Sequence, residues 1–154
     1  MSIQVVTAVI ERDDRRLLIG QRRRLDSSPL KWEFPGGKVK SGESLEQALA
    51  RELREELQVT LNRSAPISYV EHEYGGGQDT LSITFFAVSI LESELVPGPF
   101  EKVAWVLPRE LGNYDFLTAN RRLIAELATG RIKPAEILAS APSDPQRNSA
   151  PGSH

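Results

Sequence analysis

Runs of apolar and β-branched residues recur along the chain and are separated by short polar or glycine-rich stretches. Runs of this kind predict short β-strands bounded by turns. The strands are expected at residues 3–11, 16–21, 31–34, 67–74, 80–91 and 103–107. The stretches expected to be turns or loops are residues 12–14, 35–37 (Pro-Gly-Gly) and 75–77 (Gly-Gly-Gly). The pattern therefore predicts a molecule built mainly on β-sheet.

Apolar residues spaced three and four apart predict helices in the remaining segments. Long helices are expected at residues 44–58 and 118–128, with one helical turn at 108–111 and a short helix at 134–139. From residue 140 the chain is rich in Ser, Pro, Ala, Asn and Gln without periodicity, which is typical of a disordered tail. We expect a single α+β domain over residues 1–139, with helices on both faces of a mixed β-sheet, and a disordered tail over 140–154.

The helix at 44–58 carries carboxylates on its apolar face. Ser44, followed three residues later by Gln47, forms a capping-box pattern that sets where the helix begins. At about 100° per residue, the leucines of this helix define one arc that faces the core. Glu52 and Glu56 fall inside that arc, and Glu55 falls beside it.

Three carboxylates on an apolar face are unfavourable unless something positive neutralises them, because like charges repel and buried charges lose hydration. Arg51 can pair with Glu55 at i,i+4, but it cannot serve all three carboxylates. Either the carboxylates are protonated or a multiply charged cation neutralises them, and a divalent cation is the simplest resolution. The alternative is a charged helix end that leaves the core, with its glutamates in water.

Composition narrows the kinds of site and partner. The 154-residue chain has a formal net charge of −2, so it lacks the basic balance typical of nucleic-acid or anionic-membrane binding. It has no cysteine and two histidines, which leaves oxygen ligands for any metal. The amino terminus lacks a basic leader, and no apolar run approaches the roughly 18 residues that span a bilayer. We expect a cytoplasmic protein that is a monomer or a homodimer.

The spacing around this helix resembles the Nudix box. Gly37 is followed after five residues by Glu43, and after seven more by Arg51-Glu52-Leu53-Arg54-Glu55-Glu56-Leu57-Gln58-Val59. The motif agrees at each specified position except one, where Gln58 replaces a glycine. Glycine there supplies a left-handed helix end, so Gln58 is expected to cost local stability or to shift the cap.

The resemblance implies a Nudix-type α/β/α sandwich and a hydrolase of nucleoside diphosphate linkages. It implies that the Gly37 carbonyl and the carboxylates of Glu52, Glu55 and Glu56 bind Mg²⁺, with Mn²⁺ able to substitute, and that Glu52 helps to activate water. Arg51 and Glu43 would orient these glutamates. Divalent metals suit this chemistry because they offset the negative charge of the phosphates and acidify a bound water.

Two further segments resemble enzymes of the MutT type, which remove oxidised guanine nucleotides such as 8-oxo-dGTP. They are Lys31-Trp32-Glu33-Phe34-Pro35-Gly36-Gly37-Lys38 and Phe116-Leu117-Thr118-Ala119-Asn120. By this resemblance the substrate-binding residues would include Glu33, with Asn120 hydrogen-bonding the base, Phe34 packing on it and Arg22 approaching the substrate. Asn120 could instead cap a helix, and Phe34 could be a core residue. Arg22, Arg23 and Arg24 could be a solvated strand end or could steer phosphates.

The resemblance leaves the substrate open. MutT-type enzymes carry an additional metal-binding glutamate before a late strand, and here Glu101 is the nearby acid, about two residues from the expected position. We expect a nucleoside monophosphate and pyrophosphate as products, and no nucleic-acid polymer or membrane as partner. Pyrimidine nucleotides such as CTP are an alternative substrate. A non-catalytic nucleotide-binding module and RNA cap removal are alternatives of other classes.

Overall fold

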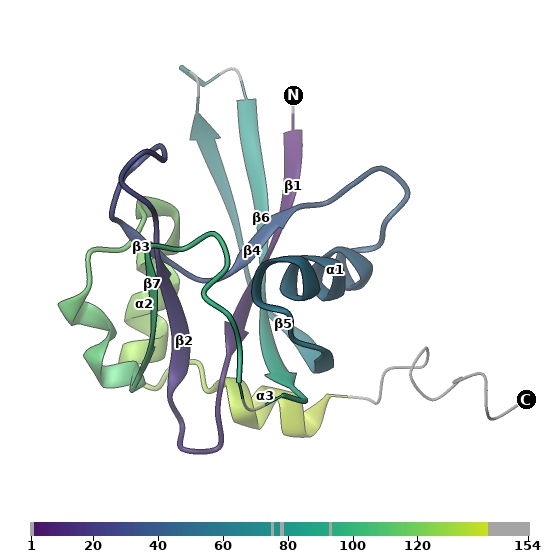
Figure 1. Cartoon of the computed structure of the whole chain (residues 1–154), viewed down its shortest axis with the longest axis vertical. Coiled ribbons are helices and arrows are strands. Elements are labelled where there is room, and N and C mark those ends of the chain that lie inside the picture. The colour runs from purple at the N-terminus through teal and green to yellow at the C-terminus, as the bar shows by residue number, and fades with distance from the viewer. Residues whose placement is uncertain (1, 75, 78, 93, 142–154) are drawn as a thin grey trace, which may run out of the picture.

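Two β-sheets occupy the centre of the computed structural model, which describes residues 2–74, 76–77, 79–92 and 94–141 (Figure 1). The larger sheet has the order β4-β1-β6-β5, formed by Gly36–Lys38, Ser2–Ile10, Asp79–Ile90 and Leu61–Tyr74. In this sheet β1 runs parallel to β6, and the other pairs are antiparallel. The smaller antiparallel sheet has the order β3-β2-β7, formed by Trp32–Glu33, Leu17–Gln21 and Lys102–Val106.

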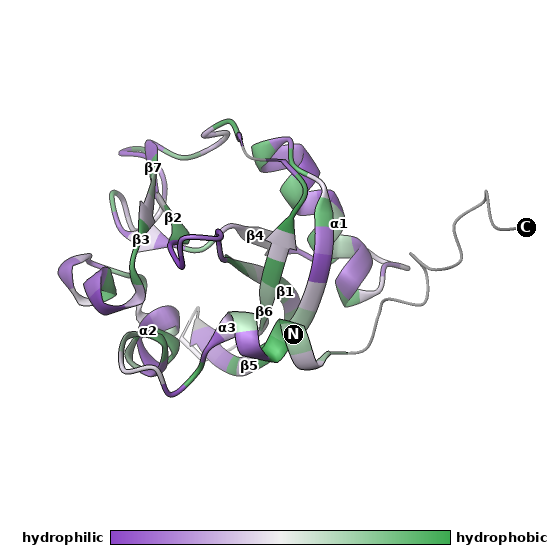
Figure 2. Ribbon diagram, turned by 90° about the horizontal axis from the view of Figure 1, so that it is seen from below, coloured by the Kyte–Doolittle hydropathy of each residue, from purple (hydrophilic) through white to green (hydrophobic). Residues whose placement is uncertain are grey.

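Helices cover both faces of the larger sheet, as Figure 2 shows from a second direction. Alternate residues of β6 point to opposite faces. Phe86 and Val88 join the core beneath α1 (Leu45–Leu57), and Phe85 joins the core beneath α2 (Arg121–Ala128). The α3 helix (Pro134–Ser140) lies on the α2 side, where Leu138 contacts Ala87. The expected α/β/α sandwich with a mixed sheet is confirmed.

The predicted start and register of α1 are also confirmed. Ser44 Oγ accepts a hydrogen bond from the Gln47 backbone at 3.1 Å, and Gln47 Oε1 accepts one from the Ser44 backbone at 2.9 Å. The buried positions of the helix are those of the predicted apolar arc: Ala48, Leu49, Leu53 and Leu57. Gln58 itself takes the left-handed conformation, with φ 58° and ψ 40°, so the helix ends at the position where the motif has glycine.

Three predicted elements need correction. Residues 35–37 were expected to be a loop, but Gly36–Lys38 forms β4, because Gly36 allows this strand to approach β1 closely. The β5 strand begins at Leu61 rather than at residue 67, and register shifts on both sides of Pro66 explain why its early part lacks a regular pattern. The helix expected over 118–128 divides into a 3₁₀ turn, η2 (Thr118–Asn120), and α2.

The segments that follow β7 complete the second helical layer. A 3₁₀ helix, η1 (Pro108–Asn113), stands where one helical turn was predicted, and α3 extends to Ser140. The tail predicted from residue 140 lies outside the described residues from 142 onward, so its disorder stays a prediction. No helix in the described ranges combines the length and the apolar character needed to cross a membrane.

Candidate active site

Glu52 projects from α1 onto the backbone of β4. A Cβ atom added at Gly37 would overlap the Glu52 carboxylate, so only glycine allows this approach. The Glu52 side chain is 15 % exposed. The capping box fixes the start of α1, and the leucine arc fixes its rotation. Together they direct Glu52 toward Gly37.

Arg51 connects α1 to the loop that precedes it. Its guanidinium binds both oxygens of Glu43, at 2.6 and 2.9 Å, and contacts Glu52 at 3.0 Å and Glu55 at 3.2 Å. It also donates to the Lys38 carbonyl at 3.1 Å. This guanidinium lowers the pKa of Glu43 to about 2, so the ion pair persists over the neutral range. Arg51 and Glu43 therefore hold the loop against the helix.

Glu56 lacks such a partner. Its Oε1 atom is buried and has no hydrogen-bond partner among the described residues. Burial, together with the neighbouring Glu52 carboxylate, raises the pKa of Glu56 to about 8, while a hydrogen bond with the Gly36 backbone opposes the shift. A carboxylate in these surroundings is stabilised by either a proton or a cation.

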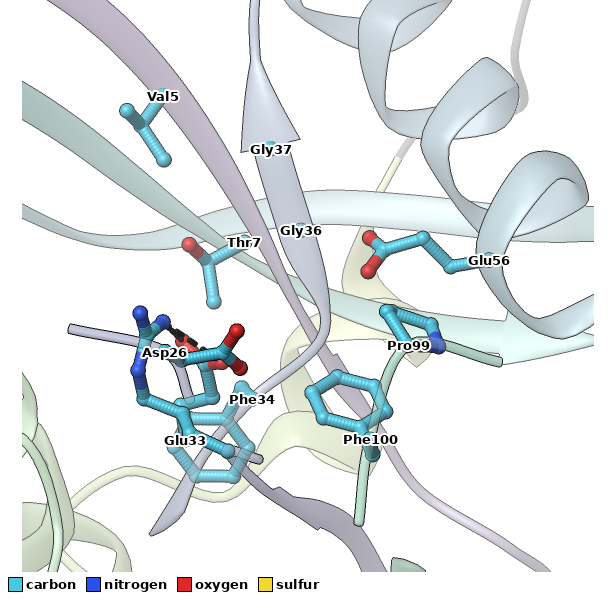
Figure 3. Close-up of a pocket in the computed structure, with 11 residues that line it drawn as sticks. Val5, Thr7, Asp26, Glu33, Phe34, Gly36, Gly37, Glu56, Pro99 and Phe100 are labelled. Carbon is cyan, nitrogen blue, oxygen red and sulfur yellow. Dashed lines mark hydrogen bonds and ion pairs between the residues drawn. The ribbon is translucent and has the colours of Figure 1, made fainter. Parts of the chain in front are cut away.

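A cavity of about 390 Å³ opens beside Glu56 (Figure 3). In the figure the Glu56 side chain points toward β4, with Pro99 close by. Across the cavity Arg22 Nη1 lies 3.2 Å from Glu33 Oε2, and burial raises the pKa of Glu33 while Arg22 opposes that rise. The other lining residues are Val5, Thr7, Asp26, Phe34, Gly36, Gly37 and Phe100.

A second cavity of about 440 Å³ adjoins the first and is lined in part by Asn120. The two cavities share Val5, Thr7, Arg22, Glu33 and Phe34. Asn120 is 5 % exposed and occupies the N-cap position of α2, but its side chain makes no hydrogen bond to the described chain and so does not cap the helix. Its amide is thus available to donate to and accept from a ligand. Apolar contact surface comes from Leu81 and Ile83, and His72 also lines this cavity.

The predicted site residues are brought together only in part. Glu52 and Glu56 meet at β4, but Glu55 is 53 % exposed and pairs with Arg51 instead. Glu101 is exposed and lies outside the cavity that contains Glu56, and its backbone N–H bonds to the Gln21 carbonyl. Phe34 is 3 % exposed and packs on Phe116, so it is a core residue whose surface also lines both cavities.

Several lining residues were not found from the sequence. Thr7, Asp26, His72, Pro99 and Phe100 come from four separate segments. They carry no shared motif and meet only when the sheets assemble. Thr7 offered one signal, since it is a polar residue in the buried half of β1.

The residues around Glu52 and Glu56 fit a divalent cation held by oxygen. Glu56 Oε1 is buried and unpartnered, and the Gly37 backbone lies against the Glu52 carboxylate. Among the described residues, no group of three acidic or histidine side chains encloses a metal by itself. A metal here would need further oxygens, which Mg²⁺ ordinarily takes from water and substrate phosphates.

Comparison with known proteins identifies the family. The NUDIX domain model matches residues 1–127. The chain belongs to the Nudix family. Nudix hydrolases act on nucleotide substrates and generally need a divalent metal ion. The expected assignment of the chain as a Nudix hydrolase is therefore confirmed.

Relatives of this Nudix hydrolase are also similar over most of their lengths. The CTP pyrophosphohydrolase of Escherichia coli (strain K12) is 33 % identical over 87 % of this chain and 98 % of its own. The 8-oxo-dGTP diphosphatase of the same organism is 31 % identical over 81 % and 95 %. The solution structure of the E. coli ORF135 protein superposes with a TM-score of 0.73 and 31 % identity, covering 93 % of this chain and 95 % of that one.

Proposed function

We propose that this Nudix hydrolase converts a nucleoside triphosphate and water to the nucleoside monophosphate and pyrophosphate, with Mg²⁺ as its metal. The observation that carries the proposal is the pair of joined cavities. One is lined by Glu56 and by Gly37, against which the Glu52 carboxylate lies, and the other is lined by Asn120, whose side chain makes no cap hydrogen bond. A nucleotide has phosphates at one end and a base at the other, and this arrangement suits both.

The carboxylates of Glu52 and Glu56, together with the Gly37 carbonyl, would hold the metal. When bound, a divalent metal offsets phosphate charge and acidifies water. Arg51 keeps Glu52 in place through its contacts to Glu43 and Lys38. One carboxylate of the Glu52–Glu56 pair then receives the proton of the attacking water. Glu55 would act indirectly through its ion pair with Arg51.

The chain also orients the substrate. Arg22 lines both cavities, where its guanidinium is held by Glu33 and by the Ser27 carbonyl at 2.7 Å. From this position Arg22 can contact the phosphate or sugar between the base and the metal. Phe34 offers an apolar surface, and Asn120 hydrogen-bonds an edge of the base.

We propose oxidised guanine nucleotides such as 8-oxo-dGTP as the preferred substrates and the cytoplasmic nucleotide pool as their source. A buried amide that donates and accepts suits a purine edge. The 31 % identity to the 8-oxo-dGTP diphosphatase supports this choice. The similar level of identity to the CTP pyrophosphohydrolase favours cytidine nucleotides as a second candidate.

A hydrolysis screen with Mg²⁺ separates these candidates. The panel contains dGTP, 8-oxo-dGTP, CTP, dCTP, methylated nucleoside triphosphates, nucleotide sugars and dinucleoside polyphosphates, with pyrophosphate and monophosphate measured as products. We expect the highest kcat/KM for 8-oxo-dGTP and equal amounts of the two products. A highest kcat/KM for a cytidine nucleotide would select the second candidate. Release of inorganic phosphate and a diphosphate would contradict the proposed bond cleavage.

A further inference from the structure

Residues 96–101, which we call the strap, connect two walls of the cavity that is lined by Glu56. At one end the Val96 N–H donates to the carbonyl of Leu57, the last residue of α1, at 3.2 Å. At the other end the Glu101 N–H donates to the carbonyl of Gln21, the last residue of β2, at 2.8 Å. The strap therefore spans from the helix that carries Glu56 to the strand that precedes Arg22.

Gly98 lies at the closest approach of the strap to α1. Its φ is +57°, a left-handed conformation that side chains other than glycine rarely adopt. A Cβ atom added here would overlap the backbone carbonyl oxygen of Glu56. Since the obstacle is backbone, it can yield only if the end of α1 or the strap moves. The position of Gly98 is therefore coupled to the position of Glu56.

Arg23 fixes the other side of Gly98. Its Nη2 atom donates to the Gly98 carbonyl at 2.9 Å. Arg23 adjoins Arg22, which lines the cavity opposite Glu56. A single residue of the strap thus contacts the backbone of Glu56 and the side chain that neighbours Arg22.

The strap also forms part of the cavity wall. Pro99 and Phe100 line the cavity beside Glu56 (Figure 3). Phe100 is buried and lies so close to β2 that a Cβ atom at Gly20 would be 2.6 Å from its ring. The segment is therefore anchored by packing as well as by its hydrogen bonds.

We infer that Arg23 and Gly98 are positioning residues that hold the end of α1, and with it the carboxylate of Glu56, in place. The inference rests on the proposed function, in which Glu56 binds the metal. In this inference Arg23 holds the strap through its hydrogen bond to Gly98 and does not steer phosphates. Arg23 acts through the Gly98 carbonyl, and Gly98 acts through the backbone of Glu56.

Binding of Mn²⁺ without nucleotide, measured by calorimetry, tests the role of Gly98. Gly98→Ala is compared with Gly76→Ala, which has a similar φ of +74° but no atom within 4 Å of an added Cβ. We expect Gly98→Ala to weaken Mn²⁺ binding by about tenfold or more, as is typical when the support of a ligand is disturbed. Gly76→Ala should bind like the wild type. Equal affinities in the two variants would overturn the inference.

The role of Arg23 is tested separately by Arg23→Gln, with Arg24→Gln as the control for lost charge. Arg23 is exposed, so this variant keeps the inference testable even if Gly98→Ala does not fold. We expect Arg23→Gln to lower Mn²⁺ affinity and kcat with little change in the KM for nucleotide, and Arg23→Lys to restore part of both. A raised KM with unchanged Mn²⁺ affinity would mean that Arg23 contacts phosphate, which overturns the inference.

Glu56→Gln distinguishes failure of this inference from failure of the proposed function. If the wild type binds Mn²⁺ and Glu56→Gln does not, but Gly98→Ala and Arg23→Gln both bind like the wild type, the positioning role alone is overturned. If Glu56→Gln binds Mn²⁺ as well as the wild type does, the proposed metal site and the inference both fail.

Discussion

Glu43 and Glu56 are glutamates of the same motif whose surroundings shift their pKa values in opposite directions. The Arg51 guanidinium lowers the pKa of Glu43 to about 2, and burial raises that of Glu56 to about 8. Near neutral pH the first carboxylate is ionised and holds a loop to a helix. The second is protonated without metal and releases its proton to water when a cation binds.

The metal-free protein should lose stability as pH rises through the window set by Glu56. The folded-state pKa of about 8 exceeds the ordinary value of 4.5, so between these pH values the folded state binds more protons than the unfolded state. The contribution of Glu56 is therefore fully present below about pH 4.5 and is lost as pH rises to about 8. Urea unfolding in EDTA measures the free energy of unfolding of the wild type and of Glu56→Gln. The stability of Glu56→Gln relative to the wild type should increase as pH rises across this window. Parallel pH profiles would contradict the assignment.

Asn120→Ala should alter the ranking of bases more than it alters stability. The amide makes no side-chain hydrogen bond within the described chain, so its removal breaks no internal hydrogen bond. Loss of one hydrogen bond to the base should lower kcat/KM for the preferred nucleotide by about tenfold, or ~1.4 kcal/mol. The screen of nucleotides described above measures the ranking. An unchanged order of substrates would show that Asn120 does not contact the base.

Helix periodicity could predict the inward direction of Glu52 and Glu56, because both fall within the leucine arc. It could not place Glu55, which falls at the edge of that arc and is drawn outward by Arg51. Nor could it place Glu101, since the position of a loop residue depends on where the loop is anchored. The hydrogen bond from Glu101 to β2 supplies that information only in the folded chain.

The α1 helix is well specified at its start and strained at its end. Ser44 and Gln47 form both hydrogen bonds of the capping box. Gln58 closes the helix in a left-handed conformation, which costs a residue other than glycine about 1–2 kcal/mol. The helix keeps its length because the Gln58 N–H bonds to the Arg54 carbonyl and Val59 is fully buried just beyond.

Gln58→Gly should therefore stabilise the protein by about 1 kcal/mol, because glycine adopts this conformation without strain. The free energy recovered by removing the strain in the folded state exceeds the free energy lost because glycine makes the unfolded chain more flexible. Ser44→Ala is the opposing control and should cost about 1 kcal/mol through loss of the cap. Urea denaturation measures both changes. A destabilised Gln58→Gly variant would refute the strain at this helix end.

Strands were harder to predict than helices, for identifiable reasons. The glycines of β4 predict a turn. In the structure Gly36 pairs with Thr7, and a Cβ atom added at Gly36 would overlap the Val6 carbonyl. The early part of β5 contains Pro66 and two register shifts, which disrupt its alternation. Both segments owe their strand structure to a partner strand far away in the sequence.

In the folded molecule, residues of one short sequence motif lie next to a cavity whose lining residues come from many parts of the chain. The carboxylate site could be predicted because its residues, from Gly37 to Glu56, lie close together in the sequence. The cavity lined by Asn120 combines residues of β1, β5, β6 and the turn before α2, including His72 and Leu81. Asn120 was found through resemblance to a family, and the other walls could be found only from the fold.

Metal-dependent turnover of the preferred nucleotide is the decisive measurement for the whole enzyme. Monophosphate and pyrophosphate should form in equal amounts with Mg²⁺, stop when EDTA is added and resume when Mg²⁺ is restored. Glu56→Gln should remove most of this turnover while its circular dichroism matches the wild type. Turnover that persists in EDTA, or a Glu56→Gln variant with the wild-type rate, would contradict the assignment of the α1 carboxylates as the metal site of a Nudix hydrolase.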